Sequence, residues 1–203
     1  MQNEVSAQAP MLLLDEFLVA AELNSLLGFA LTREPDFTQT QVVGSKNTHH
    51  TDNGYRRSRV LYELDWYRDL FIKRITAFAP HVFRALAYPT FPIGKVETQL
   101  TSTRNGEFFR RHSDNGASSV RGRRITFVYF FYREPRPFSG GELRIYNTRR
   151  DSEASEAAYT TIMPLQNQII FFLSDYIHEI IPVQGVSDDF ADSRFTVNGW
   201  LHQ

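Results

Sequence analysis

The chain has 203 residues, a formal charge of −1, and 42% hydrophobic and 14% aromatic side chains, which fits one packed domain over residues 1–203 and argues against disorder. It has no cysteine, so disulfides, thiolate metal sites and a cysteine nucleophile are excluded, and a cytoplasmic location is the default expectation. No apolar run is long enough to span a membrane, and the near-neutral charge does not favour nucleic acid as a partner.

The first third of the chain is predicted to be a mainly helical support, over about residues 1–94. One helix face has the i, i+3, i+4, i+7 spacing of a buried stripe: Leu23, Leu26, Leu27 and Ala30. Asp65 is the expected N-cap of a longer helix, which Pro80 should kink or divide. The apolar stripe of this second helix comprises Phe71, Ile75, Phe78, Val82 and Leu86.

From about residue 95 the pattern changes to short segments rich in β-branched and aromatic residues, which predict strands. The expected strands cover residues 96–103, 124–132, 142–146, 159–163, 168–173, 178–183 and 194–201. Turn-forming pairs such as Asn105-Gly106 and Gly140-Gly141 separate them. Helices followed by seven or eight strands indicate an α+β fold, with a β-sandwich or jelly-roll barrel over about residues 95–203.

Three potential metal ligands stand in the second half of the chain. His112 and Asp114 point the same way if the segment is extended, because side chains alternate along a strand. His178, at the start of an expected strand, can complete a set of two nitrogens and one oxygen. That set is typical of non-haem Fe(II) oxygenases, whereas a zinc hydrolase with the same ligands would lack an obvious general base.

Arg194, Thr196 and Asn198 share one face of the last predicted strand. If that face meets water, the arginine is inert. If the face lines the barrel interior, Arg194 is a buried cation that needs an anion, with Thr196 and Asn198 as hydrogen-bonding partners beside it. A keto-diacid held between Arg194 and the metal would meet that need, so burial of the arginine decides between the two interpretations.

Two basic segments have both a functional and a structural interpretation. Residues 48–59, which include Arg56 and Arg57, form either a lid over the site or a surface loop. Arginines near the His-x-Asp motif form either a basic rim that recruits an acidic substrate or solvated loops. They are Arg104, Arg110, Arg111, Arg121, Arg123 and Arg124.

Several motifs from about Glu97 onward occur in the order of a known family. They lie at residues 105–109, 112–115, 123–132, 138–146, 178–183 and 194–200. With these motifs the chain resembles the prolyl 4-hydroxylase-like branch of the 2-oxoglutarate- and Fe(II)-dependent dioxygenases. The resemblance implies a double-stranded β-helix, a jelly-roll or cupin-like barrel, supported by N-terminal helices.

The resemblance also implies roles for residues. Fe(II) would be held by His112, Asp114 and His178, and Arg194 would bind the far carboxylate of 2-oxoglutarate, with Thr196 and Asn198 nearby. Dioxygen would be the second cosubstrate, and ascorbate an optional reductant. The implied reaction is hydroxylation of an unactivated C–H bond, with 2-oxoglutarate converted to succinate.

The substrate expected from the resemblance is a prolyl or other residue of a protein or peptide. A free amino acid or small metabolite is the alternative, and a non-catalytic metal-binding barrel is the rival from another class. Relatives that act on nucleic acids carry a second arginine six residues after the first, where Trp200 stands here, so no nucleic-acid partner is expected. No oligomeric state follows from the sequence.

The chain departs from the family pattern at three places. Phe130 stands where many members have a tyrosine that contacts the cosubstrate, and the neighbouring Tyr129 should face the other way. Thr103 replaces another frequent tyrosine. The spacing between His178 and Arg194 indicates an inserted loop at residues 187–192.

Overall fold

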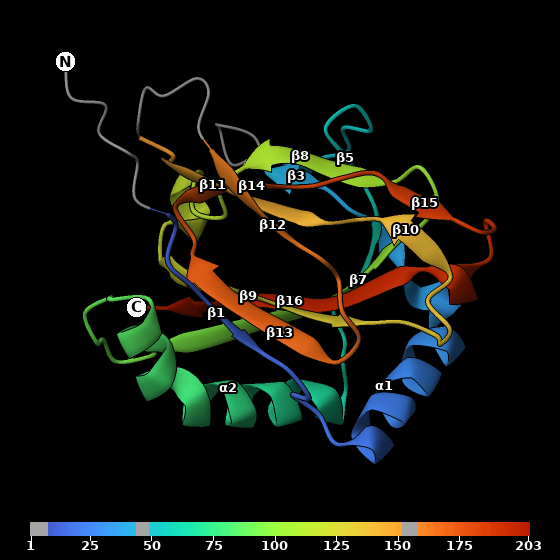
Figure 1. The fold of residues 1–203 in the computed structure, drawn as a ribbon, viewed down its shortest axis with the longest axis horizontal. Coiled ribbons are helices and arrows are strands. Elements are labelled where there is room, and N and C mark those ends of the chain that lie inside the picture. The colour runs from blue at the N-terminus through green and yellow to red at the C-terminus, as the bar shows by residue number, and fades with distance from the viewer. Residues whose placement is uncertain (1–7, 44–48, 152–157) are drawn as a thin grey trace.

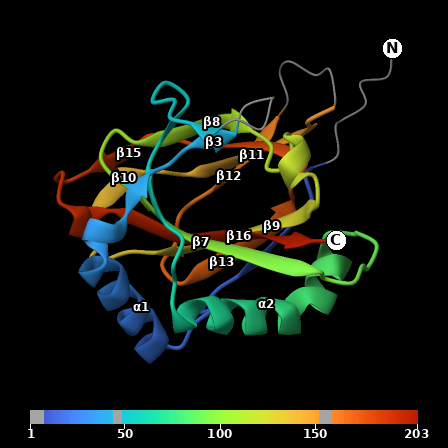
Figure 2. The same cartoon turned by 180° about the vertical axis from the view of Figure 1, so that it is seen from behind.

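The computed structural model describes residues 8–43, 49–151 and 158–203. Two facing β-sheets form a barrel, and both α-helices lie on the side of the larger sheet that faces away from the smaller one (Figures 1 and 2). The helices are α1 (Ala20–Thr32) and α2 (Trp66–Ala85), with short 3-10 turns at Glu34–Asp36, Ser118–Val120 and Phe190–Asp192. Neither α-helix in these residues combines the length and apolar character that crossing a membrane would require.

The larger sheet has seven strands in the order β1-β13-β9-β16-β7-β6-β2. Its strands are β1 (Met11–Leu14), β13 (Gln168–Leu173), β9 (Arg123–Phe131), β16 (Arg194–His202), β7 (Lys95–Thr103), β6 (Arg59–Leu61) and β2 (Thr38–Gln39). Every pairing is antiparallel, and β16 lies between β7 and β9 in the middle of the sheet. The chain's last strand is therefore central rather than at an edge.

The smaller sheet has five strands in the order β12-β11-β14-β8-β5. They are β12 (Tyr159–Ile162), β11 (Leu143–Arg149), β14 (Tyr176–Ile180), β8 (Phe108–His112) and β5 (Arg56–Arg57). Two short ribbons complete the described strands: β10 (Phe138–Gly140) with β15 (Val183–Gly185), and β3 (Val42–Val43) with β4 (His49–His50). This two-sheet barrel confirms the α+β, jelly-roll prediction.

The first third of the chain is less helical than predicted. β1 forms one edge of the larger sheet by pairing with β13, and β6 pairs with β7 near the other edge. The predicted, mainly helical support over about residues 1–94 thus contributes short strands to both sheets besides its two helices. These strands have two to four residues, too few for a period-2 pattern to separate them from a helix or loop.

The two predicted helices occur, with differences in detail. Helix α2 continues through Pro80 and is not divided. Phe78 does not belong to the buried stripe: it is 39% exposed at the border of that face, while Ala79 is buried. Asp65 precedes the helix as expected, but its carboxylate accepts from Arg33 Nη1 at 3.0 Å instead of capping a helix N–H.

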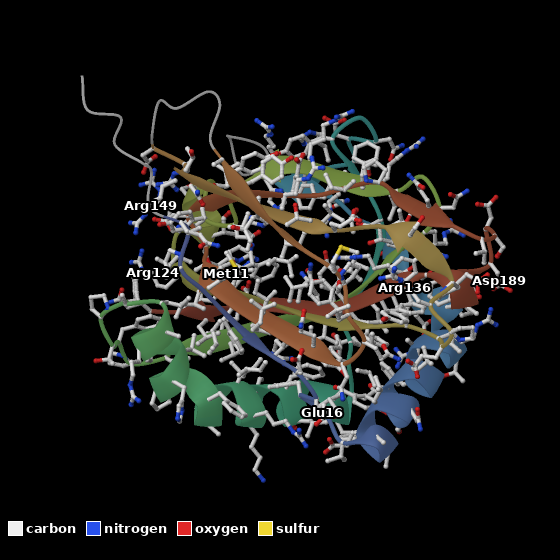
Figure 3. All side chains as sticks on the ribbon, in the orientation of Figure 1. Met11, Glu16, Arg124, Arg136, Arg149 and Asp189 are labelled. Atoms are coloured by element: carbon white, nitrogen blue, oxygen red, sulfur yellow. The ribbon has the colours of Figure 1, made fainter. Side chains whose placement is uncertain are left out.

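An aromatic core joins the helices to the larger sheet. The Tyr129 ring on β9 contacts Phe71 of α2 and Phe17, with ring centroids 5.2 and 5.8 Å away. Side chains fill the layer between this sheet and α2 (Figure 3). The opposite face of the same sheet is left to line the inside of the barrel, where polar side chains gather.

Candidate functional site

The three predicted ligands meet between the two sheets. His112 ends β8, and its cross-strand partner is His178 of β14. Asp114 lies in the turn after β8, and its backbone N–H donates to the Ser174 carbonyl at 2.9 Å. One potential ligand atom from each residue lies within 4.8 Å of the others. Because β8 ends at His112, strand alternation does not determine where Asp114 lies. The backbone hydrogen bond to Ser174 holds Asp114 in position instead.

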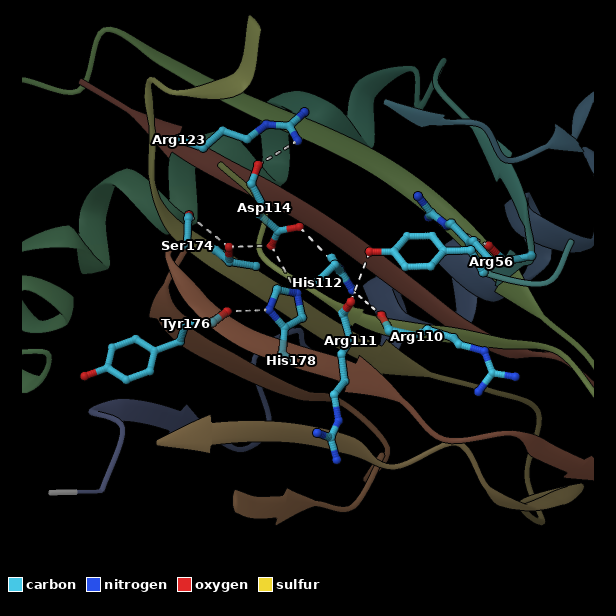
Figure 4. A network of polar contacts seen from close by, with 12 residues as sticks. Arg56, Arg110, Arg111, His112, Asp114, Arg123, Ser174, Tyr176 and His178 are labelled. Carbon is cyan, nitrogen blue, oxygen red and sulfur yellow. Dashed lines mark hydrogen bonds and ion pairs between the residues drawn. The ribbon is translucent and has the colours of Figure 1, made fainter. Parts of the chain in front are cut away.

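Both imidazoles present the same nitrogen to the shared space. Nδ1 of His112 donates to the Arg110 carbonyl at 2.7 Å, and Nδ1 of His178 donates to the Tyr176 carbonyl at 2.9 Å (Figure 4). Because a carbonyl can only accept, each Nδ1 carries a proton, and in the neutral form of either ring Nε2 holds the lone pair. The Nε2 atoms lie 3.6 and 3.3 Å from the two carboxylate oxygens of Asp114.

His112 and Asp114 are held in the protonation states that bind a divalent cation, whereas in the metal-free cluster Asp114 outweighs burial and raises the pKa of His178. Burial, followed by the nearby His178, lowers the pKa of His112 to about 3. Burial would raise the pKa of Asp114, but His178 and His112 outweigh it and hold that pKa well below its ordinary value. A neutral imidazole and an ionised carboxylate are the forms that bind metals.

Two hydroxyls that the sequence analysis did not single out orient Asp114. Thr126 Oγ1 donates to Asp114 Oδ2 at 2.7 Å, and lies 2.9 Å from the Ser174 hydroxyl. Both residues are buried polar positions beside apolar strand runs, on β9 and directly after β13. A polar residue beside an otherwise apolar run was the feature of the sequence that could have identified both positions.

Arg194 is 2% exposed, which meets the condition set by the sequence. Among the described residues, its Nε and Nη2 atoms have no hydrogen-bond partner, and its guanidinium carbon lies 5.1 Å from the centre of the Phe130 ring. Burial lowers its pKa to about 9, although the charge of Glu142 partly offsets this. A buried cation without a partner is costly, so this position favours an anionic ligand.

Gly141 creates the room that Arg194 occupies. Its φ of +70° is in the left-handed region, and a Cβ there would lie 2.7 Å from Arg194 Cδ. The Gly-Gly pair read as a turn signal thus also keeps side-chain atoms away from the arginine.

One cavity of about 700 Å³ contains the whole candidate site. Its lining includes the His-Asp-His cluster together with Arg194, Thr196 and Asn198. The last two do not bond to the arginine: Asn198 Oδ1 accepts from Thr101 Oγ1 at 2.9 Å and from Thr196 Oγ1 at 3.4 Å. These bonds use the amide oxygen of Asn198 and leave its NH₂ group to donate elsewhere.

The departures from the family pattern have clear structural counterparts. The Tyr129 hydroxyl donates to Asn167 Oδ1 at 2.8 Å and so faces away from the cavity, as predicted. Phe130 offers Arg194 a ring face instead of a hydroxyl, and Thr103, the cross-strand partner of Arg194, lines the cavity.

Within residues 49–59, His49–His50 pair with β3, Arg56–Arg57 form β5 of the smaller sheet, and Arg59 begins β6 of the larger sheet, whereas Thr48 lies outside the described residues. β5 pairs with β8 through Arg56 and Phe109, and the Tyr55 hydroxyl donates to the Arg111 carbonyl at 3.0 Å. Arg56 and Arg57 therefore form an edge strand beside the strand of His112, and Arg56 lines the cavity.

A known protein is similar to this chain in sequence. The chain is 36% identical over 191 residues to an uncharacterized PKHD-type hydroxylase of Synechocystis sp., with 92% of this chain and 61% of that protein aligned. It thus spans about three fifths of the length of that relative.

Solved structures share the fold at low sequence identity. A prolyl-4-hydroxylase of Pseudomonas putida matches with a TM-score of 0.68 and 17% identity, covering 96% of this chain and 94% of that one. A prolyl hydroxylase of Trichoplax adhaerens, in complex with a hypoxia inducible factor peptide, matches with a TM-score of 0.70 and 15% identity, covering 96% and 84%. Residues 98–202, just over half of the chain, match the family model described as 2OG-Fe(II) oxygenase superfamily. The chain therefore belongs to the 2OG-Fe(II) oxygenase superfamily, whose members use Fe(II), 2-oxoglutarate and dioxygen.

Proposed function

We propose that this chain is a single-domain 2-oxoglutarate-dependent dioxygenase that hydroxylates an unactivated C–H bond. His112, Asp114 and His178 would hold Fe(II), and Arg194 would bind the far carboxylate of 2-oxoglutarate. The observation that carries the proposal is the buried, unpaired Arg194 in the same cavity as a His-Asp-His cluster. A metal-binding barrel without catalysis would leave that arginine without an anion.

In this proposal the chain's own residues contribute binding and orientation. Nδ1–H bonds to backbone carbonyls hold both imidazoles with Nε2 toward Asp114, and Thr126 holds the carboxylate of Asp114. Arg194, supported by Phe130, would orient the cosubstrate, with Thr196 and Asn198 beside it. The chemistry supplied by bound Fe(II) and 2-oxoglutarate would be dioxygen activation, with one oxygen atom entering the substrate as a hydroxyl and the other entering succinate as carbon dioxide is lost.

The first candidate substrate is a prolyl or other residue of a protein or peptide. The names of the similar proteins support it, because both solved structures are prolyl hydroxylases and one holds a peptide. The cavity of about 700 Å³ would equally admit a free amino acid or small metabolite. A substrate screen must therefore cover both classes.

The test is Fe(II)-dependent formation of succinate from 2-oxoglutarate, with His112→Ala and Arg194→Ala as variants and the exposed His81→Ala as control. We expect the first variant to abolish turnover, the second to raise the KM for 2-oxoglutarate, and the control to match the native chain. Because turnover without substrate is slow in such enzymes, anaerobic calorimetric titration of the Fe(II) protein with 2-oxoglutarate accompanies the assay. No metal-dependent binding there would refute the proposal.

A further inference from the structure

Among the described residues, the cavity lining includes four arginines: Arg56, Arg123, Arg150 and Arg194. Arg123 pairs with Glu97 at 2.7 Å, and Arg150 pairs with Asp151 at 2.9 Å. Arg194 is assigned to the cosubstrate in the proposed function. Arg56 has no such partner: its Nε donates to the Ser58 hydroxyl at 3.2 Å, and no described carboxylate lies within 4 Å of its guanidinium.

Arg56 lies close to the proposed iron ligands. Its guanidinium carbon is 4.5 Å from the centre of the Phe109 ring, and that ring stacks on His112 with centroids 3.5 Å apart. Figure 4 shows Arg56 and His178 on opposite sides of His112. The guanidinium is thus held in place against an aromatic ring, within the cavity that would receive a substrate.

Charge balance in the loaded cavity isolates Arg56 further. The charge of Asp114 is the foremost influence favouring the charged form of Arg56, against the burial that lowers its pKa to about 10. Once loaded, Fe(II) and the 2-oxoglutarate dianion cancel each other, and Asp114 and Arg194 do the same. Arg56 then remains a partly buried cation without a counter-ion, which is unfavourable until an anion binds.

We infer that the substrate carries a carboxylate that pairs with Arg56 and so positions the C–H bond beside His112. This inference rests on the proposed function and adds the substrate class. One guanidinium charge calls for one negative charge, which favours a carboxylate over a phosphate dianion, and a guanidinium pairs with a carboxylate through two parallel hydrogen bonds. The carboxylate belongs either to a small acid or to an acidic side chain of a peptide.

The test measures binding, using the full chain loaded with Mn²⁺ and saturating 2-oxoglutarate under anaerobic conditions. Calorimetric titrations compare a panel of N-acetyl amino acids with their carboxamides. A second arm compares short blocked peptides containing aspartate or glutamate with their asparagine or glutamine counterparts. We expect acids in one arm to bind roughly tenfold or more tightly than the matched amides, and the responding arm identifies the source of the carboxylate.

Variants assign this preference to Arg56. Arg56→Gln should abolish it, Arg56→Lys should retain it in weakened form, and the exposed neighbour Arg57→Met should leave it unchanged. Equal binding of acids and amides by the native chain, or a preference that survives Arg56→Gln, would overturn the inference. Loss of 2-oxoglutarate binding in Arg56→Gln would also overturn it, by assigning the residue to the cosubstrate. If the native Mn²⁺ protein binds no 2-oxoglutarate, the proposed function itself fails, and the inference fails with it.

Discussion

Replacing Arg194 with methionine should change protein stability and cosubstrate affinity in opposite directions. In the ligand-free protein the guanidinium is 2% exposed, and its Nε and Nη2 atoms have no described partner. Methionine has a similar length and a flexible apolar chain that can pack on Phe130. Because it removes a buried charge without leaving another unpaired, we expect the ligand-free protein to gain about 1–3 kcal/mol of unfolding free energy.

The same substitution removes the proposed anchor of 2-oxoglutarate. A paired guanidinium and carboxylate form two charge-assisted hydrogen bonds, together worth about 3 kcal/mol or more when shielded from water. The dissociation constant for 2-oxoglutarate should therefore rise by roughly a hundredfold or more. Metal affinity should not fall, because Arg194 makes no described contact with the three potential ligands.

Urea unfolding of the metal-free protein measures the first effect, and anaerobic calorimetry of the Mn²⁺ protein with 2-oxoglutarate measures the second. Arg57→Met, an exposed position on the edge strand, is the matched control and should change neither quantity. A destabilised Arg194→Met protein with unaltered cosubstrate affinity would refute the reasoning, because it would make Arg194 an ordinary structural residue.

Three further predictions concern positions around the site. Gly141→Ala should weaken 2-oxoglutarate binding by calorimetry but not Mn²⁺ binding, because its Cβ would lie 2.7 Å from Arg194 Cδ at a φ of +70°. Thr126→Val removes the hydroxyl that orients the carboxylate ligand and should weaken metal binding roughly ten- to a hundredfold in a competition titration with a chelator. Burial alone would raise the pKa of Glu97. The hydrogen bonds from Lys95 and Arg123 and the charge of Arg123 outweigh burial and lower this pKa to about 2. Since its folded pKa is depressed, Glu97 should contribute stability that is present above pH 4.5 and lost as the pH falls toward 2, and urea midpoints for Glu97→Gln should fall less over that interval.

The sequence alone was sufficient for the chemistry of the site and for most strands. In a chain without cysteine, histidine and carboxylate side chains were the leading candidates for metal ligands, and the sequence pointed to His112, Asp114 and His178, which the structure brings within 4.8 Å of one another. Strands of five or more residues carried enough β-branched and aromatic positions to be predicted, apart from β8 with its charged residues. The predicted strand 178–183 is divided into β14 and β15 on either side of Pro182, which has no N–H to donate to a ladder.

Tertiary structure decided what local patterns could not express. Alternation placed Arg194, Thr196 and Asn198 on one face of the last strand. The sequence could not show that this face lines the barrel, because that depends on the pairing of β16 with β7 and β9 in the folded chain. Likewise, Asp114 is positioned by a bond to Ser174, sixty residues away, and Arg56 by the pairing of a two-residue strand with β8. A sequence period specifies which side chains share a face, whereas burial of that face depends on non-local pairing, so the unpaired arginines became evident only in the folded chain.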